Sequence, residues 1–421
     1  MLGMAERFSG EWRSVKLGDV VRGKLSYGIN AAAVPYDGKN PAYIRITDIT
    51  EYGRYNAAGK VSVIASTRER EKYRLREGDI VLARTGSVGK SYLYDPKDGE
   101  LIYAGYLIKA SINCEKCDPR YVFYQLHTRR YWSWIATMSK RSVQSGINSK
   151  EYALFTFPLP PLDEQIAIAD TLSAFDRHLA NLSELIAKHE GIRAGALEDL
   201  LSGRTRLPGF SGEWRTVKAG DIVKIIRGVS YSEHDAHRER LSGDCLILRG
   251  GNVLEDGHIT ITDSDNVYVS GNLVKDKQRI RKNDVVIVSS TASMRVIGKA
   301  GIIDADYSDV AHGAFLMLIR PIRSQNIVAE YVSWYFTTHE YRHQIKHLVA
   351  GGVIQNIKLE HIKNLMIPVP PVDEQIAIAQ TLSALDLNIS NLKAEHAKIS
   401  ALRIAAINDL LTAKIRLPRP H

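Results

Sequence analysis

Apolar side chains recur at alternating steps of three and four residues along two long stretches of the chain, 163–202 and 373–412, which align without a gap. Such spacing is typical of the contact line of a coiled coil. About forty helical residues extend for roughly 60 Å, and a helix of that length needs a partner along most of its apolar stripe. We therefore predict two long helices that pair with each other. The contact positions are Ile168, Leu172, Phe175, Leu179, Leu182, Ile186, His189, Arg193, Ala196 and Leu200 in the first stretch, and Ile378, Leu382, Leu385, Ile389, Leu392, His396, Ile399, Arg403, Ala406 and Leu410 in the second.

Arginine interrupts the apolar line at the same place in both stretches, at Arg193 and Arg403. A polar residue at such a position commonly sets the register of a coiled coil. Alternatively, the long side chain carries its charge out to the rim. The stretches could also be ordinary amphipathic helices on separate globular cores. The absence of proline inside either stretch and the unbroken spacing favour the paired helices.

The remainder of the chain is duplicated as well. Phe-Ser-Gly-Glu-Trp ends at Trp12 and again at Trp214, and Pro-Pro-x-Asp-Glu-Gln opens both long stretches. Each half is therefore a variable segment followed by a long helix. The variable segments have strand-like and helix-like patterns in turn, which predicts an α+β fold for each globular domain. The predicted boundaries are 1–157 for the first variable domain, 158–203 for the central helix, 204–367 for the second variable domain, and 368–421 for the C-terminal helix and tail.

Several elements can be placed within these segments. Proline before the long stretches predicts an extended approach to each helix, with Asp163 and Asp373 as N-caps at its positive end. Alternating or continuous apolar runs predict strands, and helical periodicity with aromatic residues predicts helices. The predicted strands lie within Ala42–Ile49, Gly78–Arg84, Leu101–Ile112, Leu246–Val253, Asn283–Ser289 and Ala314–Ile319, and the predicted helices within Pro119–Met138 and Ile327–Leu348.

The ends of the chain repeat a junction found in its middle. Arg-Leu-Pro at 206–208 precedes Phe-Ser-Gly-Glu-Trp, whereas the C-terminal Arg-Leu-Pro at 416–418 and the N-terminal Phe-Ser-Gly-Glu-Trp are separated. The ends look like a cut in a circular arrangement. We predict that they lie close together, with the two long helices antiparallel and the halves related by a pseudo-two-fold axis.

Composition narrows the class of protein. Hydrophobic residues make up 44% and charged residues 24% of the chain, which is typical of a soluble globular protein. No apolar run is long enough to span a membrane, and the N-terminal segment does not have the pattern of a secretory signal. Three cysteines in 421 residues favour a reducing compartment. We expect a cytoplasmic protein.

Charge is distributed unevenly along the chain. Residues 163–202 carry eight acidic and three basic side chains, a net charge of −5, and residues 373–412 carry five and three, a net charge of −2. Because the whole chain carries +9, the remainder must carry +16. This distribution predicts that the variable segments meet a polyanion and that the helices do not.

A glycine-rich turn follows the strand predicted at Gly78–Arg84. It ends in Gly-Lys-Ser, but a phosphate-binding loop needs glycine where this chain has Arg84, and the second half has no such loop. We interpret the turn as a set of donors for phosphates and base edges, with a solvated turn as the alternative. The candidates are Arg84, Thr85, Ser87 and Lys90, with Ser289, Ser290, Arg295 and Lys299 in the second half.

A second group of candidates precedes each proline-rich segment. Amide and guanidinium groups on a short loop can read adenine and guanine edges. The alternative is an ordinary loop that caps the next element. The candidates are Arg141, Gln144 and Asn148 in the first half, and Gln355, Asn356 and Lys358 in the second.

Catalytic and metal motifs are missing from the sequence. Cys114 and Cys117 lack a second pair, so a four-ligand zinc site is unsupported. No glycine-rich dinucleotide or methyl-donor fingerprint follows a strand, and no Asn-Pro-Pro-Tyr-type motif of amino-methylating enzymes is present. We therefore predict neither a catalytic residue nor a bound metal.

Two variable segments, each followed by a near-identical helix that begins with Pro-Pro-x-Asp-Glu-Gln-Ile-Ala-Ile-Ala, resemble the specificity subunit of type I restriction–modification systems. The resemblance covers the whole chain. It implies two target recognition domains that each read half of a bipartite, asymmetric DNA sequence. It also implies antiparallel helices that space the half-sites and dock two methyltransferase subunits. One departure is that Ser289-Ser-Thr replaces Arg84-Thr-Gly, so contacts cannot be transferred between the domains.

The resemblance further implies that the chain itself has no catalytic centre and no cofactor. S-adenosylmethionine, ATP and Mg²⁺ would belong to partner subunits, among which a restriction subunit can occur. Two other classes remain open at this point. One is a structural adaptor whose helices bind proteins and whose segments bind ligands other than nucleic acid, and the other is an enzyme such as a nuclease.

Overall fold

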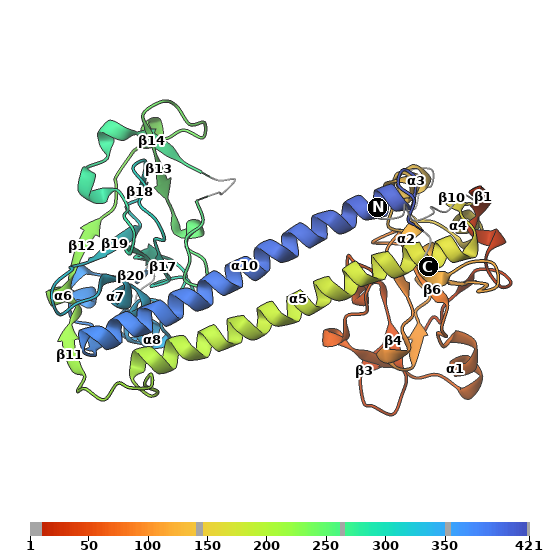
Figure 1. Cartoon of the computed structure of the whole chain (residues 1–421), viewed down its shortest axis with the longest axis horizontal. Coiled ribbons are helices and arrows are strands. Elements are labelled where there is room, and N and C mark those ends of the chain that lie inside the picture. The colour runs from red at the N-terminus through yellow and green to blue at the C-terminus, as the bar shows by residue number, and fades with distance from the viewer. Residues whose placement is uncertain (1–10, 140–145, 262–265, 350–354, 419–421) are drawn as a thin grey trace, which may run out of the picture. The chain divides into compact units, whose positions relative to one another are not determined.

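The computed structural model describes residues 11–139, 146–261, 266–349 and 355–418. Its contacts divide the chain into unit 1, which comprises Met1–Ser183 and Ala394–His421, and unit 2, which comprises Glu184–Lys393. The long helices α5 (Leu162–Ser202) and α10 (Val372–Leu410) contribute to both units and run side by side within each (Figure 1). Each unit therefore combines a variable domain with one half of each long helix.

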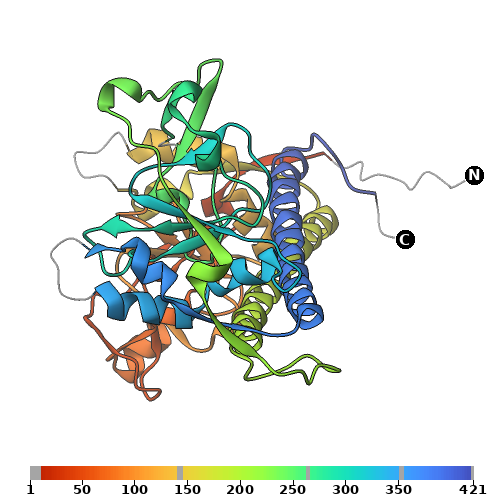
Figure 2. The ribbon, with the colours of Figure 1, turned by 90° about the vertical axis from the view of Figure 1, so that its left-hand side faces the viewer.

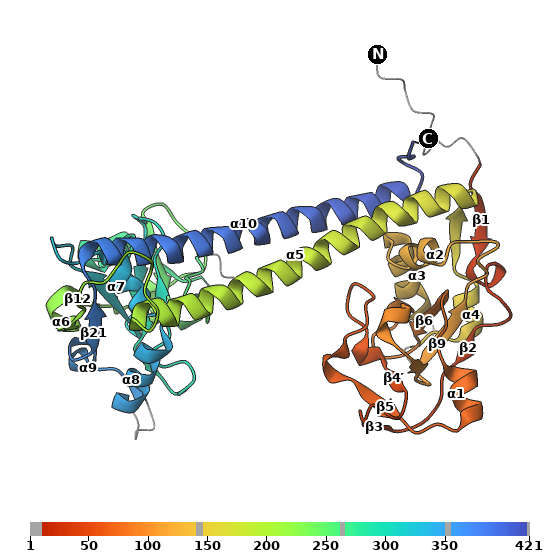
Figure 3. The same cartoon turned by 60° about the horizontal axis from the view of Figure 1, so that its bottom comes forward.

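Unit 1 contains two four-stranded sheets and a small two-stranded sheet in its described part. The first has the order β2-β9-β6-β7, the second has the order β3-β5-β4-β8, and β1 pairs with β10. In Figure 3, α2 and α3 lie beside the long helices, and β3, β4 and β5 lie at the far side of the domain. The strands are β1 (Arg13–Lys16), β2 (Ser26–Tyr27), β3 (Ala33–Pro35), β4 (Ala42–Ile44), β5 (Val61–Val63), β6 (Asp79–Ala83), β7 (Ser91–Leu93), β8 (Leu101–Tyr103), β9 (Leu107–Ser111) and β10 (Thr156–Leu159). The helices are α1 (Thr67–Tyr73), α2 (Pro119–Gln125), α3 (Arg129–Ser139) and α4 (Ser149–Ala153).

Unit 2 repeats this topology in its described part. The sheet β12-β19-β15-β17 matches β2-β9-β6-β7, the pair β11-β21 matches β1-β10, and β14-β13-β18 keeps the parallel pair seen between β4 and β8. The long helices lie along one side of these sheets (Figure 2). The strands are β11 (Arg215–Lys218), β12 (Val223–Arg227), β13 (Asp244–Leu248), β14 (Tyr268–Ser270), β15 (Val285–Val288), β16 (Ser290–Thr291), β17 (Ala300–Ile302), β18 (Val310–His312), β19 (Leu316–Pro321), β20 (Gln355–Asn356) and β21 (Met366–Val369). The helices are α6 (Ala219–Ile222), α7 (Ala329–Tyr335), α8 (His339–Val349) and α9 (Leu359–Lys363).

The long helices are antiparallel within each unit, as predicted. We call the contact line between the two long helices the seam. All the contact positions predicted for it are buried or half-buried. In unit 1, Arg403 Nε lies 2.5 Å from Asp176 Oδ1 on the other helix, and in unit 2, Arg193 Nε lies 2.7 Å from Asp386 Oδ1. Both arginine side chains therefore stay inside the seam and do not reach the rim. An ion pair that needs a partner at one level of the other helix favours a role in setting register.

The Asp-Glu-Gln motif that opens each long helix joins the helix to the variable domain. Glu164 is fully buried and accepts hydrogen bonds from Trp12 Nε1 at 3.1 Å and from Arg416 Nε at 2.9 Å. Glu374 is equally buried and accepts from Trp214 Nε1 at 3.1 Å and Arg206 Nε at 2.8 Å. We call each cluster of one tryptophan, one glutamate and one arginine a carboxylate clamp.

The carboxylate clamp also explains the repeated junction. In unit 2, Arg206 and Trp214 are eight positions apart in one segment, whereas in unit 1 the same contacts come from Arg416 and Trp12. The segments at the two ends of the chain therefore lie together on Glu164, as predicted. The outermost residues, 1–10 and 419–421, lie outside the described residues.

The glutamine of the motif anchors the helix to the domain through the backbone. Gln165 Oε1 accepts from the backbone N–H of Asp118 at 3.0 Å, and Gln375 Oε1 accepts from that of Val328 at 2.9 Å. Both amide groups also donate to the proline-rich segment, at 2.8 Å. Buried polar side chains with satisfied partners fix the angle at which each helix leaves its domain.

The prediction that Asp163 and Asp373 are N-caps was wrong. The helices begin at Leu162 and Val372, so both aspartates lie inside the first turn. The N–H of Gln165 already donates to Pro161 O at 3.0 Å, which makes the proline segment the start of the helical hydrogen bonding. The aspartates still place negative charge near the positive end of each helix.

Two predicted strands, Ala42–Ile49 and Leu246–Val253, are correct only in their first half. In each, a short 3-10 turn replaces the second half of the strand. The turn forms because a side chain, Asp48 or Asn252, accepts from the backbone N–H three residues earlier, at 2.8 and 2.7 Å. Such local bonds compete with strand pairing.

The predicted helices Pro119–Met138 and Ile327–Leu348 each form as two helices. The break falls at Thr128 and Thr338, whose hydroxyls donate to the carbonyl three residues earlier at 2.8 and 2.7 Å. Leu101–Ile112 is likewise two strands separated by a turn. Strands form within the remaining three predicted strand segments.

Candidate nucleic-acid interface

The segments between β6 and β7, residues 84–90, and between β15 and β17, residues 289–299, hold most of the predicted binding residues, and we call them the variable turns. In unit 1 the turn closes where Gly89 N–H donates to Ala83 O at 3.1 Å. Two buried tyrosines hold its ends, because Tyr152 donates to Ala83 O at 2.6 Å and Tyr131 donates to Gly89 O at 2.9 Å. The backbone of the turn is thus fixed from below by side chains of the core.

Arg84 lies where the two groups of predicted residues meet in unit 1. Its carbonyl accepts from Ile147 N–H at 2.9 Å, so the variable turn pairs with the segment that precedes α4. Its guanidinium carbon lies 4.9 Å from the centre of the Tyr27 ring, and the phenol Oη of Tyr27 accepts from Ser149 N–H at 3.2 Å. Arg84 therefore presents a fixed positive charge beside an exposed aromatic ring.

The environment of Tyr27 reflects this charge. Partial burial acts to raise the pKa of Tyr27, but the hydrogen bond from Ser149 and the nearby Arg84 charge outweigh it and lower the pKa. The hydrogen bond from Ser149 and the charge of Arg84 both favour a phenol oxygen that acts as a hydrogen-bond acceptor. Around Arg84, unit 1 therefore combines a cation, an aromatic face and hydrogen-bonding groups, which are the elements of nucleic-acid recognition.

In unit 2 the variable turn is built differently. β16 in the turn pairs with β20, so that Ser290 lies opposite Asn356, and Ser289 O accepts from Ile357 N–H at 2.8 Å. The structure thus brings together the two predicted groups in this unit as well. Ser289 itself is buried, and its hydroxyl donates to Phe315 O at 2.9 Å. Its side chain is therefore part of the support of the turn and is not exposed to a ligand.

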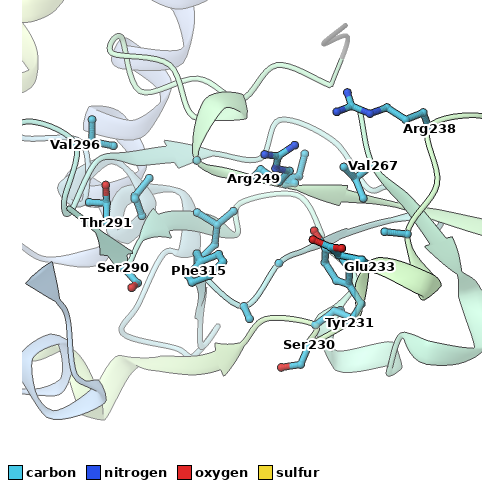
Figure 4. Close-up of a pocket in the computed structure, with 18 of the residues that line it drawn as sticks. Ser230, Tyr231, Glu233, Arg238, Arg249, Val267, Ser290, Thr291, Val296 and Phe315 are labelled. Atoms are coloured by element: carbon cyan, nitrogen blue, oxygen red, sulfur yellow. The ribbon is translucent and has the colours of Figure 1, made fainter. Parts of the chain in front are cut away.

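A cavity of about 750 Å³ lies beside this turn in unit 2 (Figure 4). Its wall includes Ser290 and Thr291 on one side, Phe315 in the middle and Glu233 on the other side. The cavity is thus lined by hydroxyl groups that can donate hydrogen bonds, by a carboxylate that can accept them, and by an apolar ring. A cavity with this lining suits the edge of a planar, polar ligand.

Lys90 and Lys299 occupy matching positions that the sequence did not align. Each follows a glycine with positive φ, Gly89 at 93° and Gly298 at 73°. Lys90 Nζ lies 2.6 Å from Glu51, and Lys299 Nζ lies 3.8 Å from Glu255. Both charges are thus already paired within the protein, so they contribute less to an anionic ligand than two free lysines would.

The other predicted residues have mixed surroundings. Asn148 Oδ1 accepts from Glu151 N–H at 3.0 Å and so caps α4, which was the alternative interpretation of this loop. Lys358 directly precedes α9 and is exposed, but its side chain makes no capping hydrogen bond. Arg295 is exposed, and its carbonyl accepts from Arg342. Thr85 is half-exposed, Ser87 and Asn356 are exposed, Arg141 and Gln144 lie outside the described residues, and only the backbone of Gln355 is described.

Sequence reasoning missed the aromatic part of the surface. Tyr27, Tyr106 and Phe315 are all exposed beside the variable turns. Tyr106 O accepts from Arg84 N–H at 3.1 Å, and Phe315 O accepts from Ser289 N–H at 3.0 Å. Leucine follows the ring directly in both halves, as Leu107 and Leu316, but the residue before the ring is glycine in one half and alanine in the other, so the match is weak in the sequence.

The described residues give no sign of a metal site or a membrane segment. Within them, no group of three or more histidine, cysteine, aspartate or glutamate side chains is placed to hold a metal ion. Among the helices described, none is both long and apolar enough to cross a membrane. Cys114 is exposed, and Cys117 and Cys245 are buried, all as free thiols.

Comparison with known proteins agrees with this picture. The family of type I restriction modification DNA specificity domains matches residues 9–188 and 211–401, most of both halves. The type I restriction enzyme MjaVIII specificity subunit of Methanocaldococcus jannaschii is 24% identical over 97% of this chain and 93% of its own length. The EcoKI specificity subunit of Escherichia coli is 32% identical over 49% of this chain and 45% of its own length.

A solved structure shares the fold. The S subunit of a type I restriction–modification system from M. genitalium covers 97% of this chain, and 99% of that chain is matched, with a TM-score of 0.58 and 15% identity. At that identity the likeness concerns the fold alone. With both halves matched by the same family and the fold repeated in each unit, the chain belongs to the family of type I restriction modification DNA specificity domains.

Proposed function

We propose that this chain is the DNA-recognising subunit of a type I restriction–modification assembly. Each unit reads one half of a bipartite, asymmetric target, and catalysis belongs to partner subunits. The observation that carries this proposal is the pair of variable turns: two dissimilar polar surfaces, around Arg84 and around Ser290, are held on one repeated topology. Dissimilar surfaces on like supports suit two different half-sites.

Charge supports a nucleic-acid ligand for these surfaces. The net charge of +16 outside the long helices favours a polyanion, and the helices themselves are acidic. Basic side chains would neutralise phosphates and give an affinity that falls with salt, whereas a few polar side chains in each unit would read base edges.

Partner subunits complete the proposal. Two methyltransferase subunits would dock on the long helices, with S-adenosylmethionine bound in those subunits. A restriction subunit would bring ATP and Mg²⁺ where the system has one. The assembly would act in the cytoplasm, where DNA and methyl donor are available.

Methylome sequencing of cells that carry this chain with its cognate methyltransferase tests the proposal. We expect methylation at one bipartite motif in cells with the wild-type chain. Arg84→Ala should change or weaken recognition in one half of the motif, and Thr291→Ala in the other, because the two residues lie in different units. Methylation at a motif that neither variant alters would count against the assignment of half-sites to units.

The role of the long helices as a spacer has a separate test. His189 Nδ1 lies 3.2 Å from Asn388 Nδ2, so Lys188 and Leu387 mark nearby levels of the two antiparallel helices. Inserting seven residues after each keeps the seam pattern and adds about 10 Å to the helix pair. We expect the unspecified spacer to lengthen by about three base pairs. Four-residue insertions at the same places break the heptad pattern and serve as the control, and an unchanged spacer with seven would refute this role.

A further inference from the structure

Each unit exposes a large aromatic side chain at the same structural position. Tyr106 lies between β8 and β9 and is 64% exposed, and Phe315 lies between β18 and β19 and is 71% exposed. β8 and β18 are matched by their parallel pairing with β4 and β13, and β9 and β19 by their pairing with β6 and β15. The two rings thus correspond, and each is the last of the three residues that join its two strands, 104–106 and 313–315.

The backbone at both rings is tied to the variable turn. Tyr106 O accepts from Arg84 N–H, and Phe315 O accepts from Ser289 N–H and from Ser290 N–H, at 3.1, 3.0 and 3.2 Å. The hydroxyl of Ser289 adds a third bond to Phe315 O. Each ring is therefore positioned by the same hydrogen bonds that position the predicted binding residues.

A close backbone crossing holds the loops from the other side. A Cβ at Gly28 would come within 2.2 Å of Tyr103 O, and a Cβ at Gly228 within 2.0 Å of Gly313 O. Only glycine permits this approach, so the strand end packs directly on the backbone next to the ring. The loop that carries each ring is therefore well packed, and the exposure of the ring does not result from a loosely held loop.

Scattered exposed apolar residues are normal on protein surfaces and need no partner. Here, however, two diverged domains keep an aromatic ring at one position, next to the turn that differs between them. In Figure 4, Phe315 lies between Ser290 on one side and Glu233 on the other, so the ring forms part of a polar surface. A ring in that setting suits a ligand with both apolar faces and polar edges.

We infer that Tyr106 and Phe315 are base-contacting, specificity-determining residues, one for each half of the target. This inference rests on the proposed function and adds the apolar part of the readout. The faces of paired bases are stacked in a duplex, so each ring would lie against a thymine methyl group or another apolar part of a base edge, since an aromatic ring gains little from phosphate. Phe315 offers apolar contact alone, whereas Tyr106 adds a hydroxyl that can bond a base edge.

Binding of the full chain, assembled with its methyltransferase, to duplexes with the intact target tests the inference. Tyr106→Ala and Phe315→Ala should each weaken binding to the target about tenfold to a hundredfold. The slope of affinity against salt should stay unchanged, because no phosphate contact is lost. Ile64→Ala in unit 1 and Leu241→Ala in unit 2, which shorten side chains 71% and 63% exposed elsewhere, are the matched controls and should bind like the wild type.

Duplexes altered in one half-site sharpen the test. Tyr106→Ala should lose discrimination in one half-site and Phe315→Ala in the other, and Tyr106→Phe should retain most of the binding. Equal losses on target and random duplexes with a reduced salt slope would show a phosphate contact and overturn the inference, as would unchanged binding by both alanine variants. If the wild-type complex shows no preference for any sequence, the proposed function itself fails, which is a distinguishable result.

Discussion

Between β6 and β7 in unit 1 the chain turns over residues 84–90, whereas between β15 and β17 in unit 2 it takes residues 289–299, four residues more. The junctions between each variable domain and its long helix differ much less. Tyr121 donates to Pro158 O and Tyr331 donates to Pro368 O, both at 2.7 Å, and both carboxylate clamps have the same three side-chain types. None of these junction contacts involves a residue of a variable turn. The sequence of a turn can therefore change without disturbing the junction.

Substitutions in the carboxylate clamps should have the largest effect on stability, and they test whether the two junctions are equivalent. Glu164→Gln removes the charge that pairs with Arg416 and should lower the free energy of unfolding of unit 1 by about 3 kcal/mol. Glu374→Gln should cost less, because the linker still holds Arg206 and Trp214 near each other in unit 2. Urea unfolding gives the free energy, and hydrogen exchange of peptides that contain Trp12 or Trp214 assigns the loss to a unit.

Glu11→Gln and Glu213→Gln supply matched controls, since both glutamates are exposed and lie beside the clamp tryptophans. Neither should change stability measurably. Equal losses for Glu164→Gln and Glu374→Gln would show that the covalent linker adds nothing to the clamp of unit 2.

Acid should affect unit 2 through a residue that unit 1 lacks. His312 in β18 is fully buried, in the register position that Tyr103 occupies in β8, and burial lowers its pKa to about 4. The unfolded chain binds this proton near pH 6.5, so the stability that neutral His312 provides is lost as pH falls from about 6.5 to 4. The loss should approach about 3 kcal/mol at pH 4.

His312→Gln removes this titration and should flatten the pH dependence of unfolding measured in unit 2. His234→Gln alters an exposed histidine of the same unit and should leave the dependence as it is. Unit 1 has its own acid-sensitive residue, His127, whose pKa burial also lowers to about 4. Peptide-resolved hydrogen exchange therefore has to be followed separately in each unit. If His312→Gln left the pH dependence of unit 2 unchanged, the prediction would be wrong.

The sequence predicted the long helices well because their signal is local and repeated. Steps of three and four residues fix which side chains form the seam, and identical motifs mark both starts. The role of Glu164 and Gln165 could not be predicted in the same way. Their partners Trp12, Arg416 and Asp118 are distant in sequence, so nothing local shows that a conspicuous acidic motif is buried.

The candidate site was predictable only in part, for a similar reason. Polar residues on glycine-rich turns are visible in a sequence, and Arg84 and Ser290 do lie on the variable turns. Whether a polar side chain faces outward depends on packing, and Ser289 and Asn148 instead bond within the protein. An exposed ring such as Phe315 looks like a core residue in any pattern of apolar positions. The domain boundaries proposed from the sequence stay predictions.

A smaller effect distinguishes how firmly each variable turn is held. Tyr131 donates to Gly89 O in unit 1, but the hydroxyl of the matching Tyr341 is buried and has no hydrogen-bond partner within the described residues. Tyr131→Phe should therefore cost about 1 kcal/mol, because Gly89 O loses its donor. Tyr341→Phe should be neutral or stabilising, because it removes an unsatisfied polar group. Thermal unfolding of both variants measures the difference, and a similar cost for the two would contradict the contrast.

The smallest expected effect comes from moving the break in the chain from unit 1 to unit 2. A circular permutant with the two present ends joined and new ends between Gly209 and Phe210 gives unit 1 the linked clamp and unit 2 the open one. The contacts of the two clamps agree within 0.1 Å for the corresponding arginine Nε and tryptophan Nε1 bonds. Since loop closure is transferred and not lost, the free energy of unfolding should change by less than about 1 kcal/mol. A second permutant opened after Thr337, between α7 and α8, cuts the core and should fail to fold. If the first permutant also failed to fold, the two clamps would not be interchangeable. The two units would then be alike in backbone topology but not in the energetics of their clamps.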